Sequence, residues 1–209
     1  MFTLSTLMTF TGIVLVLFLI PGPAVLFVGT RTVQSGRKAG VTAGLGISTG
    51  DLVHTFFAAV GLSAILMTSS VAFNVVKFAG AAYLFYLGIR AILEKPRDPQ
   101  LPKTSVVTPF KSYRQAILIE VLNPKTSLFF LAFLPQFVNP GNGTPFLQFL
   151  FLGLIFVMLS AVYTTLTALG IHLVLRFVKR ITWIGRWSGK IIGAIYIGLG
   201  LKVAIQSRN

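Results

Sequence analysis

The stretch LIPGPAVLFV (residues 19–28) lies near the end of the first long apolar run of the chain. A helix that crosses a membrane must satisfy its own backbone hydrogen bonds, because lipid tails offer no partners. Pro21 and Pro23 lack an N–H and clash with the preceding turn, so they leave carbonyl groups without their helical partners. We therefore predict that the first membrane-crossing helix is interrupted at Pro21, Gly22 and Pro23, and that the break faces protein or a water-filled cavity.

The composition is that of an integral membrane protein. Of the 209 residues, 55% are hydrophobic and only 11% are charged, and the mean hydropathy is +0.85. This leaves too little polar surface to coat a soluble protein of this size. The absence of cysteine excludes disulfides, thiolate metal sites and thiol redox chemistry, and we expect no cofactor.

Six apolar windows have the length of a membrane-spanning helix. They cover residues 6–29, 40–67, 71–93, 114–138, 145–175 and 188–206. The segment EKPRDPQLPKTSVVTPFK (residues 94–111) has four prolines and mixed charge, which is typical of an extended loop. We therefore expect two three-helix units, residues 1–93 and 114–209, joined by a cytoplasmic loop at residues 94–113.

The net charge of +14 would suggest nucleic-acid binding in a soluble protein. Most of the basic residues, however, lie on odd-numbered connections between the windows. They are Arg31, Arg37 and Lys38 on the first, Arg90, Lys95, Arg97, Lys103, Lys111 and Arg114 on the third, and Arg176, Lys179, Arg180, Arg186 and Lys190 on the fifth. The positive-inside rule places these connections in the cytoplasm and both termini outside. The charge thus reflects membrane topology, and no nucleic-acid partner is predicted.

The two units show signs of an internal repeat. KFAGAAY from Lys77 and KIIGAIY from Lys190 both match K-x-x-G-A-x-Y, and Asn123 and Pro124 interrupt the fourth window as the prolines interrupt the first. A unit of three helices reverses its orientation when it is repeated, and inverted repeats with interrupted helices are typical of secondary transporters. We predict an all-α membrane protein of six transmembrane helices, built as two inverted three-helix repeats that work by alternating access.

Asp51 is the only acidic residue in the first three windows. It lies about 16 Å along a helix from Gly40, which is close to the bilayer midplane. A charge there costs about 2.5–3.5 kcal/mol on insertion scales, so it is a candidate functional group, with Ser48 and His54 about one turn away. Its carboxylate can exchange a proton or bind a substrate ammonium; the alternative is a structural partner for Lys125.

The fourth window carries two further charges beside its break. Glu120 and Lys125 lie on different faces of a regular helix, and the break at Pro124 can bring them together. For Glu120, a place on the transport path and an interfacial role both remain open. At interrupted helices, an N-terminal end attracts a carboxylate and freed carbonyls attract an ammonium. In the fifth window, Ser160, Tyr163, Thr164 and Thr167 share one side and can line a polar cavity or hold helices together.

Glycines in the second window are expected to serve helix packing. Gly40, Gly44, Gly46 and Gly50 form two G-x-x-x-G frames. GISTG (residues 46–50) also matches the nucleophile motif G-x-S-x-G, so an intramembrane serine hydrolase using Ser48 is a remote alternative, although that motif needs a strand-to-helix turn.

A transporter of metal cations or other small solutes is a second alternative. Two histidines and no cysteine provide few ligands for a metal site. A structural subunit is a third.

The segments PGPAVLFV, GISTGDLVH and NPKTSLFFLAFLPQF follow one another at places consistent with the repeat. Together with FAGAAYLFYLGIRAI, they make the chain resemble the LysE/RhtB family of bacterial amino-acid exporters over essentially its whole length. The resemblance implies a six-helix exporter of the bacterial inner membrane that works by proton antiport, is not an enzyme, and moves amino acids or related metabolites out of the cytoplasm. Small-residue faces permit a homodimer. The family motifs correspond to Pro21, Gly22, Pro23, Asp51, Asn123, Pro124 and Lys125.

Overall fold

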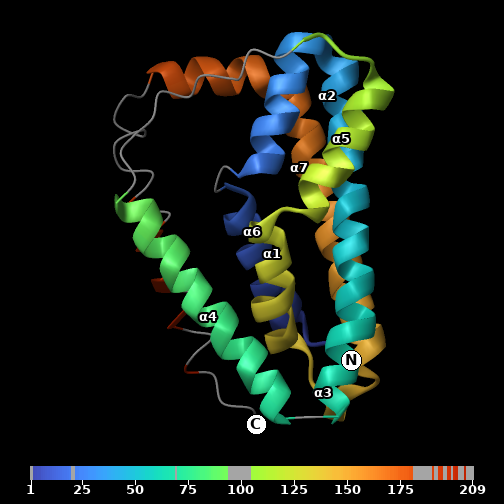
Figure 1. Cartoon of the computed structure of the whole chain (residues 1–209), viewed down its shortest axis with the longest axis vertical. Coiled ribbons are helices and arrows are strands. Elements are labelled where there is room, and N and C mark those ends of the chain that lie inside the picture. Colours follow the sequence, from blue (N-terminus) through green and yellow to red (C-terminus); the bar gives the residue numbers. More distant parts are fainter. Residues whose placement is uncertain are drawn as a thin grey trace.

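The computed structural model describes residues 2–19, 22–68, 70–93 and 105–180, and residues 190, 193–194, 197–198, 200–201 and 205 of the last window. All regular elements in this part of the chain are helices, and they form an elongated bundle (Figure 1). This confirms the all-α prediction for the described residues. Most of the sixth window, including most of the KIIGAIY segment, lies outside them.

The first apolar run is interrupted where the sequence predicts. Helix α1 (Leu4–Leu19) ends before the proline segment, and α2 (Pro23–Phe57) begins after it with Gly22 as its N-cap residue. Pro23 is at the start of α2, where a helix needs no N–H and where the fixed φ of proline suits the first turn. Pro21 lies outside the described residues.

Helix α2 is a hairpin of two antiparallel arms. Gly36 has φ 84° and ψ 168°, a backbone conformation that side chains disfavour and glycine adopts freely. A Cβ atom on Gly40 would collide with the side chain of Thr32, whereas in a straight helix the two residues would be about 12 Å apart. The chain therefore turns back at Gly36, within the predicted first connection (Figure 1). The second arm continues through η1 (Ala58–Leu62) into α3 (Ser63–Thr68).

The remaining windows also form helices. They are α4 (Ser70–Leu93), α5 (Pro109–Val121), α6 (Pro124–Leu128), η2 (Phe129–Phe133), η3 (Leu134–Phe137), η4 (Pro140–Asn142) and α7 (Pro145–Arg180). The predicted break in the fourth window is confirmed, because α5 and the segment from Pro124 to Phe137 are bent by 43°. Helix α5 begins at Pro109, within the segment predicted as the loop, because the Thr108 hydroxyl caps it by accepting a hydrogen bond from the Lys111 N–H.

Length and hydropathy identify two membrane-spanning candidates among the described residues: Pro23–Thr68, which includes the turn at Gly36, and Pro145–Ile171. The bent pair Pro109–Val121 and Pro124–Phe137 is a third if it counts as one span. Helix α1, with 16 residues, is shorter than the roughly 20 residues that a span requires. The protein is therefore a helical membrane protein, and the six spans and the inverted repeat stay predictions.

The two G-x-x-x-G frames pack α2 against two different helices. Gly40 and Gly44 face Ala168 and Thr164 of α7, and Gly46 and Gly50 face Ala116 and Glu120 of α5, all within contact distance of where a Cβ would stand. The absence of side chains lets the helix axes approach closely. The packing role predicted for these glycines is confirmed.

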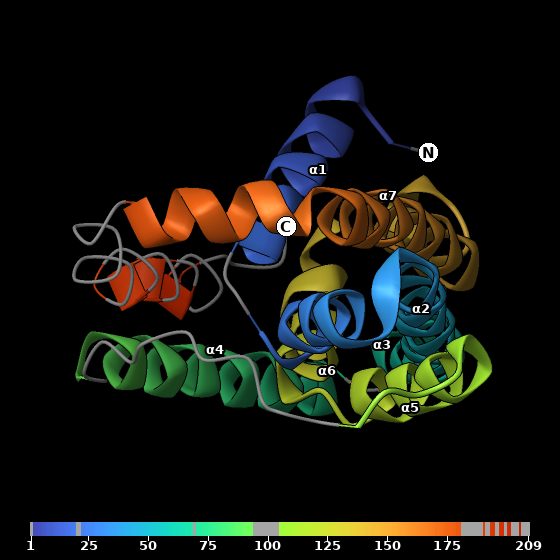
Figure 2. The ribbon, with the colours of Figure 1, turned by 90° about the horizontal axis from the view of Figure 1, so that it is seen from above.

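A second packing centre lies below the breaks in the view of Figure 1. It is an aromatic cluster of α1, η2 and α7 in which Phe10, Phe133, Phe149 and Phe156 are less than 2% exposed. Helix α4 packs against η2 at Gly80, where an added Cβ would collide with Ala132. Seen from above, α4 and the end of α7 extend to the same side of the bundle, away from α2 and α5 (Figure 2).

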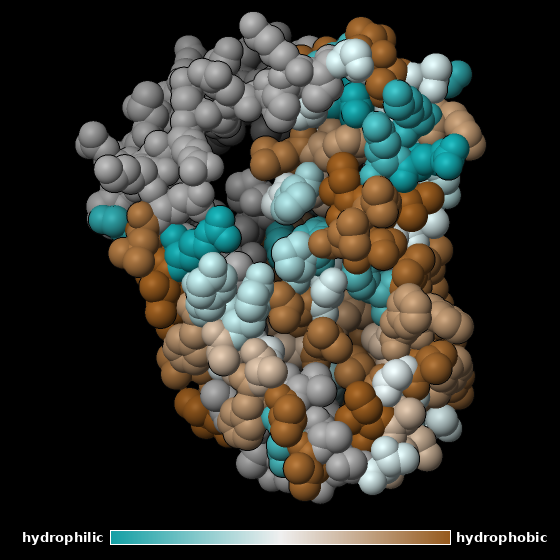
Figure 3. Space-filling view, viewed as in Figure 1, coloured by the Kyte–Doolittle hydropathy of each residue, from teal (hydrophilic) through white to brown (hydrophobic). Residues whose placement is uncertain are grey.

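Hydrophilic and apolar residues are unevenly distributed along the bundle. Hydrophilic residues gather at the upper right, over the Gly36 turn and the start of α5, whereas apolar residues dominate the lower part of this face (Figure 3). Phe2 stacks on Phe151 near the start of α7, with ring centroids 5.6 Å apart, so the N-terminal segment lies at the opposite end from the Gly36 turn. Among the described residues, the exposed Arg37 and Lys38 at the Gly36 turn and Lys111 at the start of α5 thus lie at the other end of the bundle from the N-terminal segment.

Candidate functional site

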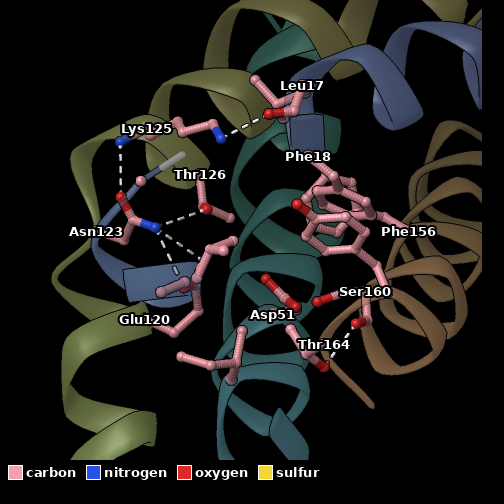
Figure 4. A pocket seen from close by; sticks show the side chains of 15 residues that line it. Leu17, Phe18, Asp51, Glu120, Asn123, Lys125, Thr126, Phe156, Ser160 and Thr164 are labelled. Carbon is pink, nitrogen blue, oxygen red and sulfur yellow. Dashed lines mark hydrogen bonds between the residues drawn. The ribbon is translucent and has the colours of Figure 1, made fainter. Parts of the chain in front are cut away.

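A small cavity lies between the two helix breaks (Figure 4). Its volume is about 30 Å³, enough for about two water molecules. The lining residues are Leu17, Phe18, Gly22, Ala24, Val25, Ile47, Asp51, Glu120, Asn123, Lys125, Thr126, Phe156, Ser160, Tyr163 and Thr164. These residues come from α1, both arms of α2, both sides of the α5–α6 break, and α7. The cavity therefore joins elements that are far apart in the sequence.

The first break leaves the carbonyl of Leu17 without its helical donor. In a continuous helix this carbonyl would accept the N–H of residue 21, but residue 21 is a proline. The Lys125 ammonium donates to it instead, at 2.6 Å. A Cβ atom on Gly22 would lie 3.3 Å from Cδ of Lys125, so the side chain passes closely over the start of α2. The two breaks are thus in direct contact.

The second break is organised by Asn123. Its Oδ1 accepts the backbone N–H of Lys125 at 3.1 Å and so caps α6. Its Nδ2 lies within hydrogen-bonding distance of both carboxylate oxygens of Glu120, the nearer at 3.1 Å, and of Thr126 Oγ1 at 3.2 Å. This explains how Glu120, 2% exposed, is held in the protein interior. The break therefore places Glu120 in the cavity, and Lys125 beside it.

The carbonyl of Glu120 lacks the N–H donor of a regular α-helix because residue 124 is a proline, and it accepts the Asn123 N–H at 2.9 Å instead. His54 Nε2 donates to this carbonyl at 2.9 Å, and the imidazole stacks on Phe130 with centroids 5.7 Å apart. His54 is absent from the cavity lining. The sequence places it one turn from Asp51, and the structure directs it to the backbone of the other break.

Asp51 is 1% exposed and lines the cavity from the second arm of α2. Its Oδ2 is buried and has no hydrogen-bond partner within the part of the chain that the structure describes. Its carboxylate points toward the hydroxyl of Ser160 (Figure 4) and is close enough to Glu120 for the two charges to interact. A buried carboxylate oxygen without a partner is costly, so this atom is suited to a cation that enters the cavity.

Helix α7 supplies both polar and aromatic lining. Ser160, Tyr163 and Thr164 line the cavity, which is one of the two interpretations that the sequence left open. Thr167 donates to the Tyr163 carbonyl at 2.8 Å and is absent from the lining. Phe156 packs edge-on against Phe18 of α1 with centroids 5.1 Å apart. The sequence analysis did not find the apolar wall of Phe18, Phe156 and their neighbours, because its residues look like ordinary membrane-helix residues.

Three of the other predicted residues lie outside the lining. Ser48 Oγ donates to the Gly44 carbonyl at 3.2 Å within a continuous helix, without the strand-to-helix turn of a nucleophile motif. Pro23 and Pro124 are exposed and act through the backbone groups that they remove or free. The cavity thus combines Asp51 and Glu120 with the ammonium of Lys125 and freed backbone groups.

Interrupted helices around a buried polar cavity in a membrane protein are the arrangement of a membrane transporter. The family model of the LysE type translocators matches residues 15–207. The chain therefore belongs to the LysE family of translocators.

Individual relatives cover nearly the whole chain. An uncharacterised membrane protein of Pseudomonas aeruginosa is 38% identical over 200 residues, which are 92% of this chain and 91% of the relative. A leucine efflux protein of Klebsiella pneumoniae is 31% identical over 90% of this chain and 89% of its own length. A leucine efflux protein of Salmonella typhimurium is 28% identical over 89% and 88%. No solved structure matches the chain.

Proposed function

We propose that this protein exports neutral, apolar amino acids such as leucine from the bacterial cytoplasm, across the inner membrane, in exchange for protons. The observation on which this depends is the buried Oδ2 of Asp51, which has no hydrogen-bond partner among the described residues and lies in a cavity lined by both helix breaks, which Lys125 connects. Membership of the LysE family and the two leucine efflux relatives support the substrate class.

The cavity offers partners for both charged groups of an amino acid. Asp51 and the freed carbonyl of Leu17 accept hydrogen bonds, so they suit the α-ammonium. Lys125 donates hydrogen bonds, and the start of α2 at Gly22 has no side-chain cap among the described residues, so the ammonium and the first N–H groups of this helix suit the α-carboxylate. Each of the two charged groups of a zwitterionic amino acid thus has partners in the cavity.

The opposite wall suits an apolar side chain. Phe18, Phe156 and Ile47 present carbon atoms to the cavity, and burying a branched aliphatic side chain against them contributes about 1.5–3 kcal/mol. A cationic side chain would compete with the α-ammonium for the carboxylates of Asp51 and Glu120. Leucine and similar residues are therefore the preferred substrates in this proposal.

Proton coupling follows from competition for the same carboxylates. Asp51 and Glu120 are two carboxyl groups in a cavity with one ammonium, so both can be ionised at balanced charge only if a further positive charge is present. Either the substrate ammonium or a proton can supply it. A proton that enters from outside displaces the substrate ammonium, and the two three-helix units then return the site to the cytoplasm by alternating access.

The test is uptake of labelled leucine into inverted membrane vesicles whose lumen is more acidic than the medium. Wild-type protein should accumulate leucine, and collapsing the pH gradient should abolish accumulation. Asp51→Asn should lose gradient-driven uptake while it inserts at wild-type levels. Asp98→Asn, in the segment between the two units, is the matched control and should transport normally. Gradient-driven uptake by Asp51→Asn at the wild-type rate would refute the role of Asp51.

A further inference from the structure

The two helix breaks share a pattern that goes beyond their prolines. In each, the carbonyl of the residue four positions before a proline lacks the N–H donor of a regular α-helix: Leu17 before Pro21, and Glu120 before Pro124. In each, a basic side chain from the other half of the chain donates to that carbonyl. Lys125 reaches Leu17 at 2.6 Å, and His54 reaches the Glu120 carbonyl at 2.9 Å. The Glu120 carbonyl accepts the Asn123 N–H at 2.9 Å as well.

The two carbonyls differ in their surroundings. His54 is outside the cavity lining and is held by stacking on Phe130. Leu17 and Lys125 both line the cavity, and so does Asp51, whose buried Oδ2 has no hydrogen-bond partner among the described residues. The donor on Leu17 can therefore be exchanged for one from a substrate, whereas the donor on Glu120 is a fixed part of the framework.

The cavity is small in this structure. Its volume is about 30 Å³, whereas small-molecule sites typically enclose roughly 300–1,000 Å³, so we expect the elements around it to separate when an amino acid binds. The hydrogen bond from Lys125 to Leu17 joins α6 to the end of α1 across 108 residues of sequence, directly at the cavity. Breaking it without replacement would take a hydrogen bond away from a buried carbonyl whose helical donor is already missing, which is unfavourable in a protein interior.

We propose that the hydrogen bond from Lys125 to the Leu17 carbonyl is a latch that holds the two breaks together. The α-ammonium of the substrate opens this latch. The substrate ammonium takes over the Leu17 carbonyl and reaches Asp51, and Lys125 turns to the α-carboxylate. Each lost hydrogen bond is replaced by one of the same kind, so the latch opens at small cost for an amino acid. A ligand without an ammonium cannot make the exchange. This inference rests on the proposed export of amino acids and assigns the atoms that receive the substrate.

The test measures the separation of the two breaks in the purified full chain in lipid. The protein has no cysteine, so Leu19→Cys and Leu122→Cys provide two exposed sites for spin labels, one at each break. Saturating leucine should shift the distance distribution to longer values. Lys125→Met should give the longer distance without leucine, Lys125→Arg should keep the shorter one, and Lys111→Met, an exposed lysine of α5, is the matched control.

A ligand series tests the wild-type side chain itself, which keeps the proposal falsifiable if Lys125→Met does not fold. Leucine should shift the distance, 3-methylbutylamine should shift it at higher concentration, and 4-methylpentanoate, which lacks the ammonium, should leave it unchanged. A shift with 4-methylpentanoate as large as that with leucine, or no shift in Lys125→Met, would overturn the latch.

Vesicle uptake by the same doubly labelled chain separates this inference from the proposed function. If leucine is transported but does not change the distance, the latch is wrong and the exporter stands. If another amino acid is transported and leucine is not, the distance measurement is repeated with that amino acid. A longer distance then supports the latch, and an unchanged distance overturns it.

Discussion

At the scale of single residues, Asn123 has the most concentrated set of contacts in the site. Its amide caps α6 and donates toward the Glu120 carboxylate and Thr126, and the residue is 3% exposed. A single side chain therefore shapes the break and stabilises a buried charge. The neighbouring Pro124 cannot do either, because its contribution is a missing N–H.

Asn123→Ala should lower the stability of the protein by about 2–4 kcal/mol, because it removes a helix cap and a donor to a buried carboxylate. The measurement is the melting temperature in detergent, followed by intrinsic fluorescence. Asn142→Ala is the matched control, since Asn142 is exposed in η4. Equal melting temperatures for the two variants would contradict the role given to Asn123.

At the scale of elements, close packing of α2 sets the width of the site. The second arm touches α7 through one glycine frame and α5 through the other, so Asp51 stands between Ser160 and Glu120.

Arg31 on the first arm also links α2 to α5. It is 6% exposed and donates to Gln115 Oε1 of α5 at 2.8 Å. The sequence analysis treated this arginine only as a topological charge, and no spacing in the sequence marks it as buried.

Gly46→Ala should destabilise the protein, because the added Cβ would collide with the backbone carbonyl of Tyr113, which cannot move without shifting α5. Gly170→Ala in α7 is the control: no atom lies within 4 Å of the added carbon, so the lower backbone entropy of alanine should stabilise the helix by about 0.5–1 kcal/mol. Melting temperatures should therefore move in opposite directions. A rise for Gly46→Ala would show that α2 and α5 are not in close contact.

At the scale of the whole molecule, the bundle has a basic end and an end that holds the N-terminal segment. Arg37 and Lys38 are exposed beside the Gly36 turn, and Lys111 is exposed at the start of α5. The loop charges predict that this end faces the cytoplasm. The orientation matters for export, because it decides from which side the substrate reaches the cavity and from which side the proton arrives.

Cysteine labelling tests this orientation in the naturally cysteine-free chain. Lys38→Cys should react with a membrane-impermeant maleimide in inverted vesicles and not in intact spheroplasts, because the positive-inside rule places this turn in the cytoplasm. Thr3→Cys, at the other end, should show the reverse. Labelling of Lys38→Cys from outside the cell would invert the proposed topology and the direction of coupling.

The sequence by itself determined the class of protein, the helix breaks and the tight glycine packing. These features are local: proline has no N–H whatever surrounds it, glycine has no side chain, and apolar composition requires lipid. It also picked out Asp51, Glu120, Asn123 and Lys125, since charged and amide side chains are conspicuous in an apolar run.

Only the tertiary structure decided which groups meet. Lys125 reaches the Leu17 carbonyl, His54 turns to the Glu120 carbonyl, and Phe18 and Phe156 form the apolar wall. No pattern in the sequence specifies these pairs, because their members are far apart in the chain and only the packing of α2 against α5 and α7 brings them together. The proline breaks free the carbonyls locally, and the fold selects the side chains that bind them.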